Sequence, residues 1–502
     1  MPEARAISRP LLVLILSSIL LAPLLFLFSH NSNYGYDDLE YLLIGRALHQ
    51  GVGFYTYGPT KSPALYYLIA GLMNLGVEFR HVSLSLAITA LNLATAWCCF
   101  FIFRKWSGGW IALAVAGLSL LAGQFMEMNY LEPEPFVVIT GLLAWHFLNN
   151  FLAAERKRDL LLAGLFIGLG ILFKTVAGFY GLAAALAVIW RMKSRPALDI
   201  AAALGLLTAA SVFPVALTAA AFGMSGRLWP FFEFTFVFPL LRISATIEYL
   251  PKLYTKLLWV NLLILAALGL LFSHRARAIT LSRPPIYLAL LFGLSAAIAL
   301  LKNQASHYEF PALPFFLFFA ASLATQLFSV KQASRHAIFV SVAVVGALAL
   351  SLGIYRPTAI ARLFSLRNFE PVERRQEDIV ARLSPPGSYI LMTTPTRTIW
   401  TYWITGRYPP PPFMAMDVKT IWTMRHQPDD FFHVLENGKL ALVEFRLSQL
   451  DRPKLEDPFG EAPGDKELMV RFHDILVRDF NLALELPNRQ TYWVRKPAPA
   501  LP

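Results

Sequence analysis

The sequence predicts a polytopic α-helical membrane protein with about 11 transmembrane helices, followed by a C-terminal α/β domain outside the membrane. The chain has 502 residues, of which 56% are hydrophobic and only 15% are charged, whereas soluble domains carry about 25% charged residues. Apolar segments near the length of a spanning helix, about 20 residues, recur up to about residue 354. They lack the alternation of barrel strands, so helices are the expected spanning form.

The first predicted span covers residues 11–28 and follows two basic residues, as a signal peptide would. The run is long for a signal core and no clear small-x-small cleavage site follows it, so we expect an uncleaved span. The other spans are expected at 82–103, 109–127, 133–152, 160–173, 175–190, 198–222, 255–272, 286–301, 310–329 and 337–354.

Basic residues alternate between the loops in a way that fixes the predicted topology. With 11 spans, every basic cluster lies on one side, as positive-inside loops require, and the net charge of +12 needs no nucleic acid to explain it. The N-terminus is then cytoplasmic, and the loop after the first span lies outside. Merging 160–173 with 175–190 would invert every later loop, so we expect Lys174 to separate two spans at an outer turn.

Composition divides the chain into a membrane domain, residues 1–355, and an outer domain, residues 356–502. The membrane domain has a long first outer loop, residues 29–80. In it we predict a helix from Asp38 to Gln50 and an interfacial apolar segment at 62–77. In the outer domain we predict strands at 388–394, 439–445 and 491–495 and helices at 396–405, 428–436 and 465–479.

Two adjacent carboxylates follow the first span. Asp37 and Asp38 lie in the stretch Tyr34-Gly-Tyr-Asp-Asp-Leu-Glu-Tyr41, where the chain leaves the bilayer. Neighbouring carboxylates repel and hold one proton more tightly, which suits one of them to accept a proton from a hydroxyl group. The same residues would also cap the helix that follows, and both interpretations can hold together. Glu40 is expected to be a solvated residue of that helix.

Lys61 lies in Tyr57-Gly-Pro-Thr-Lys-Ser-Pro63, where two prolines restrict the backbone around a single cation. A rigidly placed lysine that faces the outer leaflet is suited to bind a phosphate. The alternative is an interfacial lysine whose charge reaches the lipid headgroups. Tyr66 and Tyr67 begin the following apolar stretch and are typical, by composition, of a membrane interface.

A second acidic cluster, Glu132 and Glu134, lies in Asn129-Tyr-Leu-Glu-Pro-Glu-Pro135 in the next predicted outer loop. Glutamate and proline also begin helices in the ordinary way, so capping alone would explain them. Lys174 interrupts an apolar run, and a charge at the membrane is a candidate for function, although charge costs little at an outer turn.

The last outer cluster contains Lys302 and the segment His307-Tyr-Glu-Phe-Pro-Ala-Leu-Pro314, which includes Tyr308. Acids and cations therefore return to one face from several outer loops, as a shared site above the spans would require. The sequence contains no HExxH, paired-cysteine, Walker A or GxGxxG motif. A divalent metal is thus not supported by a motif, and the outer topology argues against a cytosolic nucleotide as direct substrate.

These segments resemble the GT-C membrane glycosyltransferases, most closely the bacterial branch related to protein O-mannosyltransferases and lipid A aminoarabinose transferase. Asp37-Asp38 resembles the Asp-Glu motif of that superfamily. Lys61-Ser-Pro-Ala-Leu-Tyr-Tyr67 is similar to the Lys-Pro-Pro-Leu-Tyr-Tyr element of the branch. The other similar segments are Leu131-Glu-Pro133, His307 to Pro314, and Thr401-Tyr-Trp-Ile-Thr-Gly-Arg-Tyr-Pro-Pro410, the last of a type common in the outer domains.

The resemblance implies a GT-C fold in a bacterial inner membrane, with the C-terminal domain in the periplasm. It implies a polyprenyl-phosphate sugar as donor and a lipid, glycan or protein as acceptor, with membrane lipids around a monomer and no nucleic acid. Transfer would invert the anomeric centre, with Asp37 as base, Asp38 and Glu132 orienting sugar or acceptor, and Lys61 on the phosphate. Tyr66, Glu134, Lys174, Lys302, His307 and Tyr308 are further candidate substrate-binding residues.

Three departures from the family pattern limit this assignment. Ser62 replaces a proline, His307 replaces an arginine, and Glu40 stands where the aminoarabinose branch tends to have arginine. The last change weakens an assignment to lipid A aminoarabinosylation. A transporter or flippase for a lipid-linked sugar is the alternative function, but it should show polar groups in the middle of its spans or an internal repeat. A membrane scaffold would leave the recurring acids and cations unexplained.

Overall fold

The computed structural model describes residues 2–30, 36–57, 61–126, 128, 130–237, 274–298, 306–327, 375–393, 398–411, 424–425, 428–437, 439–447 and 465–497. The chain forms two compact units. The first contains Met1–Asn33, Lys61–Leu65 and Glu78–Arg367, and the second contains Tyr34–Thr60, Tyr66–Val77 and Asn368–Pro502. Most of the predicted outer loop is thus grouped with the C-terminal residues, while the domain division at residue 355 stays a prediction.

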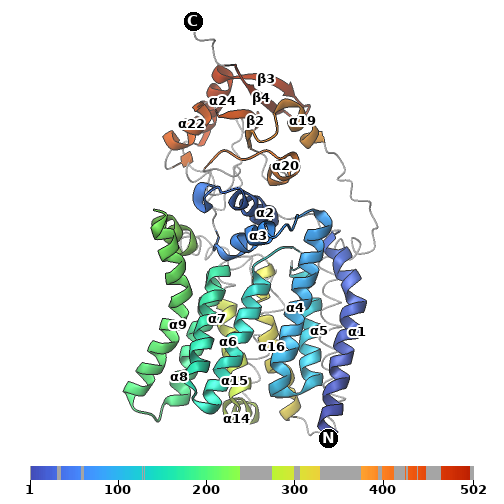
Figure 1. Ribbon diagram of the computed structural model, residues 1–502, viewed down its shortest axis with the longest axis vertical. Helices are drawn as coiled ribbons and strands as arrows, with labels where there is room; N and C mark the ends of the chain where they lie inside the picture. Colours follow the sequence, from blue (N-terminus) through green and yellow to red (C-terminus); the bar gives the residue numbers. More distant parts are fainter. Residues whose placement is uncertain are drawn as a thin grey trace. The chain divides into compact units, whose positions relative to one another are not determined.

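The first unit is a bundle of apolar helices that run side by side (Figure 1). Each predicted span within the described residues corresponds to one of them, and the predicted spans 255–272 and 337–354 lie outside those residues. Five have the length and hydropathy of a full membrane span. The helices are α1 (Pro2–His30), α4 (His81–Ser107), α5 (Gly109–Phe125), α6 (Glu134–Ala154), α7 (Lys157–Phe173), α8 (Gly178–Met192), α9 (Ala197–Met224), α15 (Pro284–Ala297) and α16 (Leu313–Leu327), with α10 (Leu228–Phe232), the π-helix η3 (Glu233–Val237) and α14 (His274–Ser282) between them.

The chain reverses direction at Lys174, as the charge pattern predicts. Helix α7 ends at Phe173, Lys174 has extended backbone, and a short 3-10 turn, η2 (Thr175–Ala177), leads into α8. Gly141 of α6 lies against Tyr180 of α8, and eleven residues further along both helices Arg191 Nε donates a 3.1 Å hydrogen bond to the Leu152 carbonyl. Helices α6 and α8 are therefore parallel, with α7 between them in sequence.

Small residues let the helices approach closely. A Cβ at Gly168 of α7 would lie 2.2 Å from the Ser211 carbonyl oxygen of α9, and one at Gly164 would lie 2.6 Å from that of Leu207. Aromatic residues fill the interior elsewhere, where Phe103 stacks on Phe318 with ring centroids 4.3 Å apart. Close approach through small residues is a common way for transmembrane helices to associate.

The second unit contains a four-stranded sheet with strand order β1-β2-β4-β3. Strands β1 and β2 are parallel, and the other pairs are antiparallel. The elements of this unit are α2 (Tyr36–His49), η1 (Phe54–Tyr57), α3 (Ala64–Asn74), α19 (Arg375–Leu383), β1 (Tyr389–Met392), α20 (Thr398–Thr405), α22 (Pro428–Glu436), β2 (Leu440–Arg446), α24 (Asp465–Asp479), β3 (Phe480–Glu485) and β4 (Gln490–Arg495). The first two residues of α3 belong to the first unit.

The predicted helices and strands of the C-terminal domain are confirmed, within two residues at each end, but α19 and β3 were not predicted. Strand β3 follows α24 with no intervening turn. Its residues Asn481-Leu-Ala-Leu-Glu485 include good helix formers, so the sequence alone favours a continuation of the helix. Pairing with β4 decides the conformation instead.

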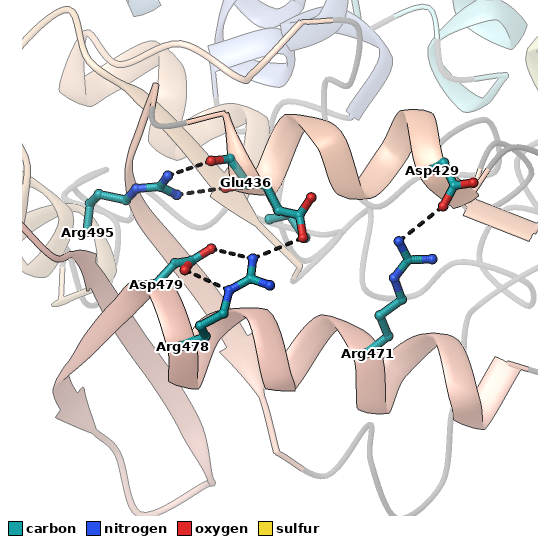
Figure 2. A network of polar contacts seen from close by, with 7 residues as sticks. Asp429, Glu436, Arg471, Arg478, Asp479 and Arg495 are labelled. Atoms are coloured by element: carbon teal, nitrogen blue, oxygen red, sulfur yellow. Dashed lines mark hydrogen bonds and ion pairs between the residues drawn. The ribbon is translucent and has the colours of Figure 1, made fainter. Parts of the chain in front are cut away.

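Arginines join the two helices that cover the sheet core, in which Phe445 stacks on Phe472 with centroids 5.1 Å apart. Figure 2 shows Arg478 between Asp479 and Glu436, while Arg471 reaches Asp429. Arg495 donates to the last carbonyls of α22, at 2.7 Å each. These contacts complement the negative end of that helix.

Candidate active site

The first unit brings three of the predicted site residues into contact at the junction of α6, α7 and the turn before α16. Lys174 forms an ion pair with Glu134, whose carboxylate lies at the first residue of α6. The Lys174 side chain retains 15% exposure and that of Glu134 is fully buried. Lys174 Nζ also lies 3.6 Å from the ring centroid of Tyr308, in the 3-10 turn η6 (Ser306–Glu309). One ammonium group thus joins residues that are far apart in the sequence.

The helices around this cluster hold it firmly. Phe136 of α6 stacks on Phe173 of α7 with their rings parallel and centroids 4.6 Å apart. The buried Tyr180 hydroxyl donates a 2.9 Å hydrogen bond to the Pro311 carbonyl, three residues beyond Tyr308. Asn92 of α4 donates to the Met128 carbonyl at 2.7 Å, which secures the loop that leads to Glu132. Buried polar contacts therefore order the ends of these elements that lie beside the cluster.

Electrostatics keep Lys174 charged. Burial alone lowers the pKa of its ammonium group, but the carboxylates of Glu134 and Glu132 outweigh this and raise the pKa above its usual range. Lys174 is therefore protonated at every physiological pH. Glu132 and Glu309 are also buried.

Lys61 belongs to the same unit and is half-buried, three residues before α3 begins. The two residues that follow it, Ser62 and Pro63, are buried. Its role as the cation beside a phosphate stays a prediction.

The second unit contains the acidic stretch of the predicted first outer loop. Asp37 and Asp38 lie in the first turn of α2, which confirms that they begin a helix, and Asp38 is fully buried. Tyr66 of α3 is also fully buried, and its hydroxyl donates a 2.5 Å hydrogen bond to Glu40 Oε1. The Tyr66 ring packs against Tyr41, with centroids 4.8 Å apart.

The expectation that Glu40 is solvated is wrong, because its side chain is 5% exposed. A signal for this burial exists in the sequence. Leu43, Ile44 and Ala47 lie three, four and seven residues beyond Glu40, on one helical face, and all three are buried. We expected Glu40 to be solvated because it is charged, although it lies on this apolar face. Glu309 was not among the predicted site residues.

Several predicted site residues lie outside what the structure describes. These are Lys302 and the side chains of Asp37 and His307. Among the described residues, no group of three or more His, Cys, Asp or Glu side chains is placed to hold a metal ion.

Comparisons with known proteins bear on this arrangement. Residues 60–217 match the family described as dolichyl-phosphate-mannose-protein mannosyltransferase. A search of curated protein sequences finds no match. The matched segment includes Lys61, Glu132, Glu134 and Lys174, so it contains most of the first unit's candidate site.

Several solved structures are similar over nearly the whole chain, among them the following two. ArnT from Cupriavidus metallidurans, bound to undecaprenyl phosphate, is 15% identical with a TM-score of 0.50, over 96% of this chain and 97% of that one. The oligosaccharyltransferase AglB from Archaeoglobus fulgidus, in complex with an inhibitory peptide and a dolichol-phosphate, is 14% identical with a TM-score of 0.52, over 96% of this chain and 74% of that one. The chain therefore has the fold of the GT-C membrane glycosyltransferases and, over residues 60–217, the sequence pattern of the mannosyltransferase family, which confirms the predicted resemblance.

Proposed function

We propose that the chain is an integral membrane glycosyltransferase that moves a sugar from a polyprenyl-phosphate donor to an acceptor lipid, glycan or protein. The observation that carries this proposal is the family match over residues 60–217, because that segment of the sequence includes Lys61 as well as the buried Lys174–Glu134 pair. The similar ArnT structure is bound to undecaprenyl phosphate, which supports a lipid phosphate as the carrier.

The proposed chemistry is a single displacement at the anomeric carbon. The bond from that carbon to the phosphate oxygen breaks, and the electron pair leaves with the phosphate. A lipid phosphate is a good leaving group, so a cation beside it helps more than a general acid. Lys61 is assigned to this cation. The acceptor hydroxyl attacks from the opposite face and loses its proton to Asp37, which gives inversion.

The remaining candidates orient the reactants. The ion pair with Lys174 fixes Glu134 at the start of α6, and Tyr308 covers the ammonium group. Glu132, two residues away, is assigned to the sugar or acceptor hydroxyls together with Asp38. Tyr66 is assigned a supporting role in place of direct substrate contact, because its hydroxyl bonds to Glu40 and the residue is fully buried.

We place the protein in a bacterial inner membrane with its N-terminus in the cytoplasm and its C-terminal residues in the periplasm. The basic clusters support this orientation under the positive-inside rule. A reporter fused after Pro502 should therefore read as periplasmic, and a cytoplasmic signal would contradict the orientation.

The decisive experiment compares Asp37→Asn with Asp378→Asn, a matched change at an exposed carboxylate of α19. Each variant is returned to a strain that lacks the gene, and its glycolipids and polysaccharides are profiled. Asp37→Asn should abolish transfer while the protein remains folded and inserted, and Asp378→Asn should restore it. Full transfer by Asp37→Asn would remove Asp37 as the base. Accumulation of the donor on the inner leaflet in the deletion strain would instead favour a flippase.

A further inference from the structure

Arg46, in the last turn of α2, contacts the C-terminal part of the second unit. Its Nη1 and Nη2 atoms donate to the carbonyl oxygens of Trp403 and Tyr402, at 3.3 Å and 3.5 Å. Its guanidinium carbon lies 4.5 Å from the Trp403 ring centroid and 5.4 Å from that of Tyr408. One side chain therefore joins the first outer loop to residues more than 350 positions away.

The chemistry of this contact favours arginine. Tyr402 and Trp403 lie in the last turn of α20, where carbonyl groups lack helical partners and the helix dipole is negative. A guanidinium group can donate to two carbonyls while its face stacks on aromatic rings. Nearby, the Tyr408 hydroxyl donates a 2.7 Å hydrogen bond to Gln50, just beyond the end of α2.

The residues that receive Arg46 are fixed to the sheet. The Ile390 amide of β1 donates to the Tyr408 carbonyl at 2.9 Å, and the Tyr408 amide donates to the Ser388 carbonyl at 3.1 Å. Arg407 donates to the carbonyls of Ser384 and Ala381, at the end of α19. The segment Thr405-Gly-Arg-Tyr408, which resembles a pattern of outer domains, therefore has a structural role: it fixes Tyr408 beside β1, at the edge of the sheet.

Helix α2 connects this contact to the acidic pair. Asp38 and Arg46 are eight residues apart on one continuous helix, which corresponds to about 12 Å along its axis. Tilting or sliding the helix at its Arg46 end would therefore displace Asp37 and Asp38 at the other end. Catalytic groups tolerate displacements of only about 1 Å without large losses in rate.

We propose that Arg46 is a positioning residue, through which the C-terminal sheet holds α2 and sets the placement of Asp37 and Asp38. This inference rests on the proposed function, in which Asp37 acts on the acceptor. It gives the C-terminal domain a defined role in the transfer reaction, other than binding substrate.

The first measurement is hydrogen exchange of the full-length protein, which needs no substrate. Arg46→Met keeps about the length of the side chain and removes its charge. Arg46→Lys keeps the charge but loses the planar guanidinium group that donates from two nitrogens. Amides of α2 should exchange about tenfold faster in Arg46→Met and less so in Arg46→Lys. Amides of β2 and β4 should be unchanged. Equal exchange of α2 in Arg46→Met and the parent protein would overturn the proposal.

The second measurement separates positioning from stability. In Arg46→Met we expect the transfer rate to fall about tenfold to a hundredfold, with affinity for undecaprenyl phosphate in nanodiscs changed less than about twofold. Arg46→Lys should restore part of the rate. Arg382→Met, at an exposed arginine of α19, is the matched control and should behave as the parent.

Trp403→Leu provides an independent variant. Its combination with Arg46→Met should transfer sugar no more slowly than either single variant, because both changes remove the same contact. Faster exchange of α2 together with a full transfer rate would overturn the positioning role. No transfer by the unaltered protein would contradict the proposed function and the catalytic part of this inference, and the exchange data distinguish that result from a failure of the contact itself.

Discussion

The Tyr66 hydroxyl donates a 2.5 Å hydrogen bond to the Glu40 carboxylate, and both side chains are buried where α3 packs on α2. This hydrogen bond joins α2 to α3 within the second unit.

Removing this hydroxyl should destabilise the second unit. Tyr66→Phe takes a donor from a buried carboxylate, which costs about 1–3 kcal/mol. Thermal unfolding of the purified protein in detergent checks this. Tyr67→Phe is the matched control, because Tyr67 is 47% exposed, and it should change stability by less than about 0.5 kcal/mol. An equal effect of the two changes would show that the Glu40 bond contributes nothing.

Replacing one member of the Lys174–Glu134 pair should lower the stability of the protein more than replacing both. Lys174→Met leaves the buried carboxylate of Glu134 without its ion-pair partner, and breaking a buried pair costs about 3–5 kcal/mol. Replacing both residues, as Lys174→Met with Glu134→Leu, should recover most of that stability because the buried Glu134 carboxylate is removed together with its cation. The matched control is Lys157→Met, at an exposed lysine of α7. Unfolding temperatures of the purified variants test this prediction. An unfolding temperature of Lys174→Met equal to that of the parent protein would contradict it.

The sequence predicted the membrane helices and the sheet domain well because each has a strong local signal. Long apolar runs identify spans, and the alternation of basic loops required a turn at Lys174, which the structure confirms. The candidate residues Glu134, Lys174 and Tyr308 meet, as their shared outer side suggested. The predicted topology and the sign of each charge were sufficient to predict this contact.

Other features depend on tertiary contacts that leave a weak local signal. Strand β3 is a strand because β4 pairs with it, and its own residues suit a helix equally well. The Arg46 contact joins α2 to α20 across most of the chain. No spacing rule links residues so far apart, and an arginine in the last turn of a helix is explained by the dipole alone.

Acid should weaken the network between α22 and α24. Hydrogen bonds from Arg478 lower the pKa of Asp479 below its ordinary value. A depressed pKa contributes stability that is present above the unfolded-state value, about 3.9, and is lost as the pH falls through the folded-state value. Because Arg478 is 59% exposed, solvent limits the effect to below about 1 kcal/mol.

Hydrogen exchange of β3 amides between pH 6 and pH 3, corrected for the intrinsic rate, measures this loss, because that range includes the ordinary pKa values of carboxyl groups. Asp479→Asn should flatten the pH dependence. Asp429→Asn removes the charge of a side chain that is 90% exposed and should leave the pH dependence unchanged. A flat profile in the parent protein would mean that the Arg478 contacts seen in Figure 2 do not affect stability.

Gly45 should tolerate no side chain, because α2 and α3 are in contact there. A Cβ at this position would lie 2.5 Å from Ile69 Cγ2 and 3.0 Å from Ile69 Cβ. Gly45→Ala therefore forces the helices apart at a cost of about 1–3 kcal/mol. Gly71→Ala, in α3 with nothing within 4 Å of its Cβ, should instead stabilise the helix by about 0.5–1 kcal/mol. If the clash is the cause, Ile69→Ala added to Gly45→Ala should recover part of the stability that Gly45→Ala loses, because the shorter side chain lets α2 return to its place beside Tyr66, and thermal unfolding of the purified variants measures this.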